Sequence, residues 1–337
     1  MTEAELDELL STPRAETVET LRHCPGDVVI LGAGGKMGPT VARMAARAAS
    51  QVGDGRRVFA VSRFGTPELV RALGAAGVET IPCDLLDRDA VARLPDVPNV
   101  IFMAGQKFGT SDAPANTWAM NTIVPAICAE RFRGARIVAF STGNVYPLTP
   151  VTLGGAREGD EVGPVGEYAS SALGRERVLE FYSARHRTPV AIIRLNYAID
   201  LRYGVLADIA LRIWHGEPVP LAMGHVNVIW QGDASRIAIE ALAQAATPPF
   251  VVNVTGTETL AVRDIAQTFA KALGRPVRFK GKERADALLS NTDRMRSTFS
   301  APDVPLETMI GWIADWIRDD RPMLGKPTHF EERSGKF

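Results

Sequence analysis

Residues Val28 to Gly38 read VVILGAGGKMG and lead directly into an alanine-rich stretch with helical character. The four apolar residues at the start of this stretch are typical of a buried strand in a parallel sheet. Gly32 can adopt backbone angles that a side chain forbids, Gly35 lets a ligand approach the main chain, and Gly38 lets the helix pack closely on the strand. A helix N-terminus adds free N–H donors and a positive dipole end. The combination predicts a corner that binds the pyrophosphate of a dinucleotide, the alternative being a glycine-rich turn of purely structural use.

The end of the second predicted strand bears on which dinucleotide binds. Val58–Val61 is followed by Ser62 and Arg63, whereas a site that prefers NAD usually has Asp or Glu there to accept from the ribose hydroxyls. An arginine can instead form a bidentate pair with a 2′-phosphate. Ser62 could add a hydroxyl and Lys36 a second positive charge. The pattern favours NADP and leaves NAD as the alternative, in which Arg63 is a solvated charge at a strand end.

The composition argues against several classes of partner. The 337 residues carry a net charge of −1, which gives no electrostatic reason to expect nucleic acid or an anionic membrane. The three cysteines and five histidines have no CxxC, HxH or HExxH spacing, so we expect no metal site. The N-terminal segment has no apolar signal core, and no stretch approaches the ~20 apolar residues of a membrane span. We therefore expect a soluble, cytoplasmic protein that acts on a small molecule.

Strands and helices alternate along the rest of the chain, which predicts an α/β fold with a Rossmann-type doubly wound parallel sheet. Further predicted strands are Val78–Pro82, Asn99–Met103, Arg136–Phe140, Val190–Arg194 and Phe250–Val254. Further predicted helices are Thr117–Arg131, Ser170–Ala184, Gly204–Gly216, Leu260–Leu273 and Leu306–Ile317. Ligands of such sheets bind beyond the carboxyl ends of the strands.

The expected domain organisation has four parts. Residues 1–26 form a helical extension of two short helices, indicated by the capping-box spacing of Thr2 and Glu5 and by Thr12-Pro13 as a helix start. This extension could pack on the domain edge or on a partner subunit. The other parts are a dinucleotide-binding domain at 27–200 with a return at 227–256, a smaller C-terminal α/β substrate lobe at 201–226 and 257–320, and a surface arm at 321–337.

Taken together, a series of motifs resembles the extended short-chain dehydrogenase/reductase family, the NAD-dependent epimerase/dehydratase group, over residues 27–319. The motifs are Gly32, Gly35 and Gly38; Asp84-Leu85; Ala104-Gly105; Asn121; Ser141-Thr142 with Val145-Tyr146; Tyr168 with Ser171; and Arg194 with Asn196. The resemblance implies Asp84 by the adenine, Ala104 and Gly105 along the cofactor, Thr142 and Tyr168 at the reacting carbon, and a homodimer formed by the helices near Asn121 and Tyr168. The candidate cofactor-binding residues are Gly32, Gly35, Lys36, Met37, Gly38, Ser62, Arg63, Asp84, Leu85, Ala104, Gly105, Asn121 and Tyr168.

Tyr168, Thr142 and Arg175 are the candidate catalytic residues. Hydride transfer at an alcohol carbon also moves the hydroxyl proton, which a tyrosine with a lowered pKa can exchange while a neighbouring hydroxyl holds the substrate oxygen. In the family, a lysine four residues after the tyrosine lowers that pKa, and here the position is Ala172. Arg175 lies on the same helix face as Ala172 and could reach back in its place. The alternatives are that Arg175 is a solvated helix charge, or that hydride transfer has been lost.

The predicted substrate residues point to a small carbohydrate or sugar acid. Family members that act on nucleotide sugars usually carry an arginine just before the strand at 228–230, where this chain reads MGHVN over 223–227. His225 and Asn227 better suit a polyol, sugar acid or lactone, although His225 also reads as an ordinary loop histidine. Arg202 could hold a carboxylate or be solvated. The candidate substrate-binding residues are Gln106, Thr142, Asn144, Asn196, Arg202, His225 and Asn227.

Three functions are compatible with these observations. The leading one is an NADP-linked oxidoreductase acting on a hydroxyl or carbonyl group of a small carbohydrate or sugar acid. The second is a sugar epimerase or dehydratase that retains NAD for a transient oxidation. The third is a non-catalytic protein that senses NADPH. Arg63 favours the first and third, Ala172 favours the third, and the presence of both Thr142 and Tyr168 favours an enzyme.

Overall fold

Seven parallel strands form the central sheet of the computed structural model, which describes residues 1–107, 112–326 and 328–336. The strand order is β12-β7-β5-β4-β1-β2-β3, so the sheet is doubly wound and its order reverses between β1 and β4. The strands are β1 Val28–Leu31, β2 Val58–Ser62, β3 Glu79–Pro82, β4 Asn99–Phe102, β5 Arg136–Thr142, β7 Val190–Leu195 and β12 Phe250–Val254. Each matches a predicted strand to within two residues, and the predicted α/β class is confirmed.

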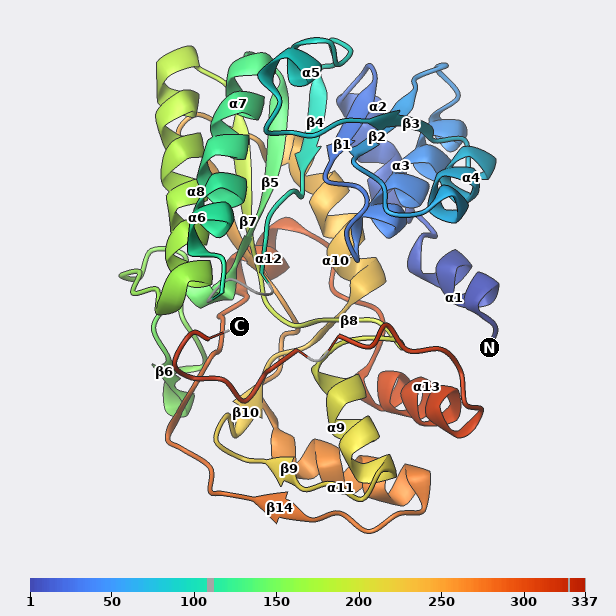
Figure 1. The fold of residues 1–337 in the computed structure, drawn as a ribbon, viewed down its shortest axis with the longest axis vertical. Helices are drawn as coiled ribbons and strands as arrows, with labels where there is room; N and C mark the ends of the chain where they lie inside the picture. Colours follow the sequence, from blue (N-terminus) through green and yellow to red (C-terminus); the bar gives the residue numbers. More distant parts are fainter. Residues whose placement is uncertain (108–111, 327, 337) are drawn as a thin grey trace.

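Helices cover both faces of the sheet, which explains the continuous apolar strands. Successive residues of a strand point to opposite faces. Val28 and Ile30 accordingly pack in one core with α2, α3 and α10, whereas Val29 and Leu31 pack in another with α5, α7 and α8. Figure 1 shows these two helical layers on either side of the strands. The helices of this domain are α2 Ala15–His23, α3 Gly38–Val52, α4 Pro67–Ala75, α5 Arg88–Ala92, α6 Pro114–Trp118, α7 Val124–Arg131, α8 Gly166–His186, α10 Gln231–Glu240 and α12 Asp293–Thr298.

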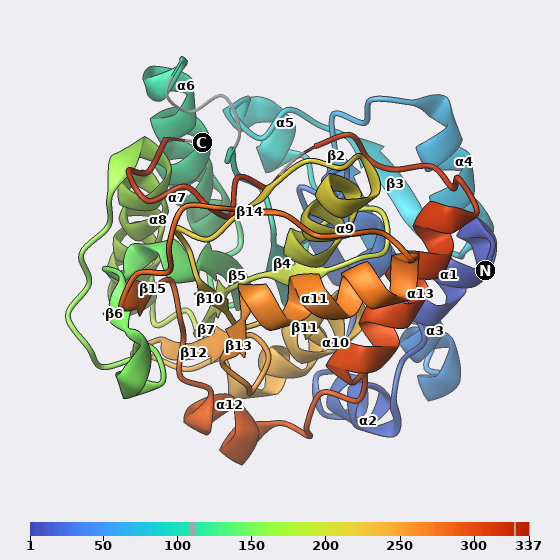
Figure 2. The same ribbon diagram turned by 90° about the horizontal axis from the view of Figure 1, so that it is seen from below.

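A smaller lobe lies beyond the carboxyl ends of the strands. Its core is formed mainly by α9, α11 and α13, which lie together when the molecule is seen from below (Figure 2). Ile209, Phe269 and Ile313 are buried where these three helices meet. The helices are α9 Val205–Trp214, α11 Val262–Leu273 and α13 Leu306–Arg318, and short strand pairs complete the fold: β6 Thr149–Pro150 with β15 Asp286–Ala287, β8 Ala198–Ile199 with β11 Ile229–Trp230, β9 Val219–Pro220 with β14 Phe279–Lys280, and β10 His225–Val226 with β13 Leu260–Ala261.

The N-terminal extension joins the two hydrophobic cores. The capping box of α1 (Glu3–Leu10) is confirmed, because Glu5 N donates to Thr2 Oγ1 at 3.2 Å and Thr2 N donates to Glu5 Oε2 at 2.7 Å. Leu6 of α1 is buried in the core of the smaller lobe, and Val18 of α2 is buried in the core of the sheet domain. The expected start of the second helix at Thr12-Pro13 is wrong, since α2 begins at Ala15 without a side-chain cap.

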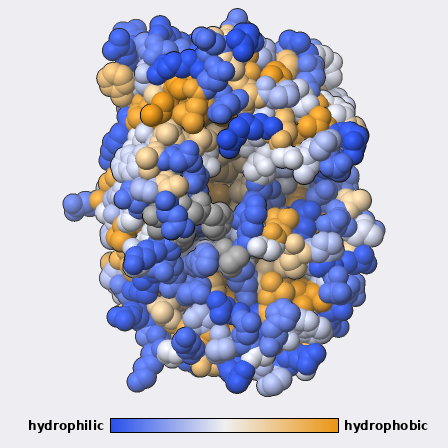
Figure 3. Space-filling model, in the orientation of Figure 1, coloured by the Kyte–Doolittle hydropathy of each residue, from blue (hydrophilic) through white to orange (hydrophobic). Residues whose placement is uncertain are grey.

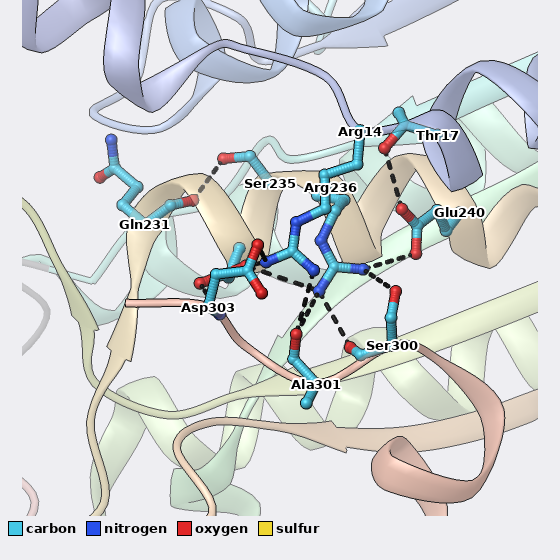
Figure 4. Close-up of polar contacts among 10 residues, drawn as sticks. Arg14, Thr17, Gln231, Ser235, Arg236, Glu240, Ser300, Ala301 and Asp303 are labelled. Carbon is cyan, nitrogen blue, oxygen red and sulfur yellow. Dashed lines mark hydrogen bonds and ion pairs between the residues drawn. The ribbon is translucent and has the colours of Figure 1, made fainter. Parts of the chain in front are cut away.

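A buried group of charges ties this extension to α10 (Figure 4). Arg14 forms a 2.8 Å ion pair with Asp233, and Thr17 Oγ1 donates to Glu240 Oε1 at 2.9 Å. Arg236, only 2% exposed in its side chain, forms a 2.8 Å ion pair with Glu240 and donates to Ser300 O at 3.0 Å. The extension thus packs on its own chain, on the face of the sheet domain that α10 covers.

Two segments differ from the sequence-based expectation. The helix predicted over Thr117–Arg131 is interrupted by a π-helical turn, Ala119–Ile123, between α6 and α7. The described residues from 322 onward are only partly exposed, because Thr328 and Phe330 are buried, with Phe330 in the core of the smaller lobe. Figure 1 shows this segment crossing from α13 towards α8; residues 327 and 337 lie outside the described part. Within the described ranges, no helix is long and apolar enough to cross a membrane.

Candidate active site

A cavity of about 540 Å³ lies where the strand order reverses, between the sheet domain and the smaller lobe. Its walls are the glycine turn after β1, the segments that follow β4 and β5, the first turn of α8, the loop before α9 and the C-terminal segment. The space-filling view shows a recess at the centre of this face (Figure 3). This is the position that the fold offers to a nucleotide cofactor.

The glycine turn forms one wall of the cavity in the conformation that glycine permits. Gly32 has φ +88°, and a Cβ on it would lie 2.5 Å from Ala104 N, at the end of β4. A Cβ on Gly38 would lie 2.4 Å from Ala33 O, so the start of α3 packs directly on the turn. Gly35 and Met37 also line the cavity. Phosphate oxygens can approach the main chain closely here, at the N-terminus of a helix, and this arrangement fits the pyrophosphate of a dinucleotide.

Of the three residues predicted to bind a 2′-phosphate, only Ser62 and Arg63 lie at the end of β2. Ser62 Oγ lies beside the turn, since a Cβ on Gly34 would be 2.5 Å from it, and Arg63 is exposed at the end of β2. Lys36, in contrast, turns into the cavity, where its Nζ lies 3.3 Å from the centre of the Tyr203 ring. Lys36 thus contacts the smaller lobe and does not lie beside Arg63 as expected.

The remaining predicted cofactor residues lie along the strand ends. Asp84 is exposed and its Oδ1 accepts from Leu86 N at 3.0 Å, whereas Leu85 buries its side chain in the sheet-domain core. Ala104 is buried, and Gly105 lines the cavity. These positions leave the Asp84 carboxylate and the main chain at Gly105 accessible to a ligand.

Tyr168 and Thr142 meet at the cavity wall. Tyr168 lies in the first turn of α8 and Thr142 at the end of β5, and a hydrogen bond joins the two side chains. Thr142 Oγ1 also accepts from Asn144 N at 3.2 Å and from Asn144 Nδ2 at 3.1 Å. Burial raises the pKa of Tyr168, whereas the hydrogen bond with Thr142 and the positive charge of Arg175 lower it.

Arg175 is buried beneath this pair, which rules out the solvated helix charge. Its Nη1 donates to Phe140 O at 2.6 Å and its Nη2 donates to Asn121 Oδ1 at 2.6 Å. A Cβ on Gly105 would lie 2.1 Å from Nη2, so the glycine leaves room for the guanidinium. Asn121, in the π-helical turn, also donates to Ser171 Oγ at 2.9 Å. π-Helical turns are frequent at functional sites, and this one aims Asn121 at the guanidinium.

Ala172 does not face this charged group. Its methyl group packs in a small apolar cluster with Val145, Tyr146 and Ala156. The loss of the family's lysine therefore leaves a dry contact between α8 and the segment after β5. Two cationic side chains lie near Tyr168: Arg175, whose charge lowers the pKa of the phenol, and Lys107, whose Nζ lies 5.7 Å from the centre of the Tyr168 ring.

The structure separates the predicted substrate residues into two groups. Gln106, Asn144 and Asn196 line the cavity together with Thr142. Arg202, His225 and Asn227 lie outside its lining, so the structure does not bring them together with the other predicted substrate residues. Arg202 forms ion pairs with Asp200 at 2.8 Å and Asp7 at 3.2 Å, His225 lies in β10, and Asn227 donates to Glu258 O at 2.8 Å.

Several residues that line the cavity were not predicted from the sequence. Lys107 stands two residues after Gly105, and its position beyond a strand end was a signal that could have been used. The C-terminal segment contributes Lys326, Thr328, His329, Phe330 and Glu332 to the cavity lining. No periodicity or motif marks that segment, so its folding back over the cavity could not be read from the sequence.

Comparison with known proteins agrees with this geometry. The model of the NAD-dependent epimerase/dehydratase family matches residues 28–236, whereas no curated protein sequence matches the chain. The UDP-glucose 4-epimerase of Thermotoga maritima, solved with UDP-glucose, is 16% identical with a TM-score of 0.70 over 87% of this chain and 99% of its own. The dTDP-glucose 4,6-dehydratase DesIV of Streptomyces venezuelae, solved with NAD, is 18% identical with a TM-score of 0.73 over 87% and 97%. Pal of Bacillus thuringiensis is 18% identical with a TM-score of 0.72 over 88% and 100%.

At these identities the solved structures establish the fold, and the family model covers more than half of the chain. The glycine turn and the Tyr168–Thr142 pair line the same cavity, which lies where the strand order of the sheet reverses. The chain belongs to the NAD-dependent epimerase/dehydratase family.

Proposed function

We propose that the protein is an NADP-linked oxidoreductase acting on a hydroxyl or carbonyl group of a carbohydrate or sugar acid. The observation that carries the proposal is the hydrogen-bonded pair of Tyr168 and Thr142 in the wall of a cavity that the glycine turn also lines. A phenol and a hydroxyl group that share one ligand-sized cavity with the glycine turn support this proposal.

Each of these groups has a distinct proposed role. The glycine turn would hold the pyrophosphate of NADP, and the bound nicotinamide supplies the hydride chemistry. Thr142 would hydrogen-bond the substrate oxygen and fix its orientation, with Asn144 steadying the Thr142 hydroxyl. Tyr168 would take the hydroxyl proton during oxidation and return it during reduction.

Arg175 is the proposed source of positive charge beside Tyr168. A cation stabilises the phenolate and lowers the tyrosine pKa, so its removal should raise that pKa. We expect Arg175→Met to shift the pH profile of kcat for oxidation to higher pH by about one unit, because oxidation requires the deprotonated phenol. Arg175→Lys, which keeps the charge, should shift it less. A lower rate with an unmoved profile would reduce Arg175 to a structural support for Asn121 and Phe140.

Arg63 is the proposed determinant of NADP preference. Its exposed position after β2, with Ser62 Oγ beside the glycine turn, suits a 2′-phosphate. Arg63→Ala should weaken NADPH binding about tenfold or more and leave NADH binding nearly unchanged, as measured by equilibrium titration of both nucleotides. Arg71→Ala, an exposed arginine on α4, serves as the control. Equal losses for both nucleotides would remove Arg63 from cofactor selection.

A second candidate is a sugar epimerase or dehydratase that retains NAD. The observation in its favour is the C-terminal segment, which covers the cavity and would keep an oxidised intermediate in place. The solved structures named above include enzymes of that kind, which act on nucleotide sugars.

A homodimer formed by α7 and α8 is a further proposal, supported by the exposed apolar side chains of Trp118, Ile123 and Phe181 around these helices.

A further inference from the structure

Three lysines from separate parts of the chain line the cavity. Lys36 comes from the glycine turn, Lys107 from the segment after β4, and Lys326 from the C-terminal segment. Glu332 is the one carboxylate among the described lining residues. The cavity wall is therefore cationic, although the protein as a whole has a net charge of −1.

The charged forms of Lys36 and Lys107 are destabilised by their surroundings. Burial lowers the pKa of Lys107 to about 8. Burial, together with repulsion from Lys107 and Lys326, lowers the pKa of Lys36 to about 7. A bound anion would relieve both penalties, because it would compensate the desolvated charges and screen their mutual repulsion.

Nearby acidic groups are engaged by the C-terminal segment. Asp208 attracts Lys36 and Lys107, but its Oδ2 accepts from Thr328 N at 2.7 Å and from Thr328 Oγ1 at 2.5 Å. Glu332 Oε1 accepts from Ser334 Oγ at 2.6 Å. Asp208 thus fixes the segment that carries Lys326, and Glu332 is engaged within that segment.

The same segment is anchored on both sides of the residues that line the cavity. Leu324 N donates to Arg202 O at 3.1 Å, and Arg333 forms a 2.6 Å ion pair with Asp286. Its last described residues touch the start of α8, where a Cβ on Gly166 would lie 2.3 Å from Gly335 O. Lys326 is therefore carried by a strap that reaches from the smaller lobe to the helix of Tyr168.

We infer that Lys36, Lys107 and Lys326 bind an anionic group attached to the reacting sugar itself, a carboxylate or a phosphate. Lys107 Nζ lies 5.7 Å from the centre of the Tyr168 ring, so the anion would sit within about one sugar length of the reacting carbon. This inference rests on the proposed function for the position of the reacting carbon. It names the substrate class as sugar acids or sugar phosphates.

The test compares matched sugars on the full-length protein saturated with NADP⁺. The probes are D-glucose, D-gluconate and D-glucose 6-phosphate, with their binding measured by calorimetry and their turnover by NADPH formation. The variants are Lys107→Met, which keeps the stem without the charge, Lys107→Arg, which keeps the charge, and Lys271→Met, an exposed control on α11. NADPH affinity is measured for each variant.

We expect at least one anionic sugar to bind more tightly than glucose. Lys107→Met should weaken that binding, or raise its KM, about tenfold to a hundredfold, with glucose and NADPH affinity unchanged. Lys107→Arg should retain most of the affinity, and Lys271→Met all of it. Preference for gluconate identifies a carboxylate, and preference for glucose 6-phosphate identifies a phosphate.

Other outcomes separate the two proposals. Anion-selective binding that depends on Lys107, without turnover, supports the lysine site and contradicts the proposed oxidoreductase. Turnover with equal losses for neutral and anionic sugars contradicts the lysine site and leaves the oxidoreductase standing. A Lys107→Met variant that loses NADPH affinity instead assigns the lysines to the cofactor and overturns the inference, as does failure of both anionic sugars to bind the unmodified protein.

Discussion

Tyr168→Phe is expected to lower kcat about a hundredfold to ten-thousandfold while leaving the affinity for NADPH nearly intact. The substitution removes only the hydroxyl that exchanges a proton with the substrate, and general acid–base groups contribute rate factors of that size. The ring that contacts the cavity remains, so cofactor binding should change little. Steady-state kinetics and NADPH titration on the same preparation test both parts.

Tyr182→Phe is the matched control for this experiment. Tyr182 lies on the same helix as Tyr168, but its ring packs against Phe181 and His186, away from the cavity. Its variant should retain wild-type kcat. Retained activity in Tyr168→Phe would remove this residue from the chemistry, and with it the main support for an oxidoreductase.

Arg236→Leu is expected to reduce the free energy of unfolding by about 3–5 kcal/mol. The guanidinium is buried between Asp233 and Glu240, and its loss leaves the buried Glu240 carboxylate without its ion pair and Asp233 with only its ion pair to Arg14. Burial raises the pKa of both carboxyls, and the charge of Arg236 is the largest of the influences that lower it. The variant should therefore regain stability as the pH falls and these carboxyls become protonated, as urea titrations at several pH values would show.

The comparison for that experiment is an exposed ion pair of the same type. Arg71 pairs with Glu68 on α4 with 70% of each side chain exposed, so Arg71→Leu should change stability by less than about 1 kcal/mol. Equal effects of the two substitutions would show that the buried charges around Arg236 contribute no more to stability than an exposed ion pair. NADPH affinity of the folded Arg236→Leu protein should remain unchanged, since Arg236 lies outside the cavity lining.

The sheet and the cofactor corner could be predicted because their signals are local. An apolar run such as Val28–Leu31 has to be covered on both faces, and a turn with glycines at fixed spacing has few conformations. Thr142 and Tyr168 lie together because the carboxyl end of a strand and the first turn of a helix that follows it are on the same edge of a parallel sheet. The helical reach that brings Arg175 back toward Tyr168 follows from side-chain direction in a helix.

The substrate side was less predictable because it depends on tertiary contacts. Arg202 and Asn227 looked available in the sequence, but Asp7, Asp200 and the Glu258 carbonyl engage them in the fold. The C-terminal segment has no helical or strand pattern, and tertiary contacts such as those with Asp208 and Asp286 hold it at the cavity. Lys36, Lys107 and Lys326 are far apart in the sequence and line one cavity only because of the tertiary fold, so no sequence spacing predicts the cluster.

The identity of the bound nucleotide tests the central claim most directly. The purified full-length protein is unfolded, and any nucleotide released is identified and quantified by mass spectrometry. An NADP-linked oxidoreductase exchanges its cofactor at every turnover, so we predict either an empty protein or substoichiometric NADP that exchanges freely with added NADPH. Near-equimolar NAD that resists exchange would contradict the account and establish the retained-cofactor epimerase or dehydratase in its place.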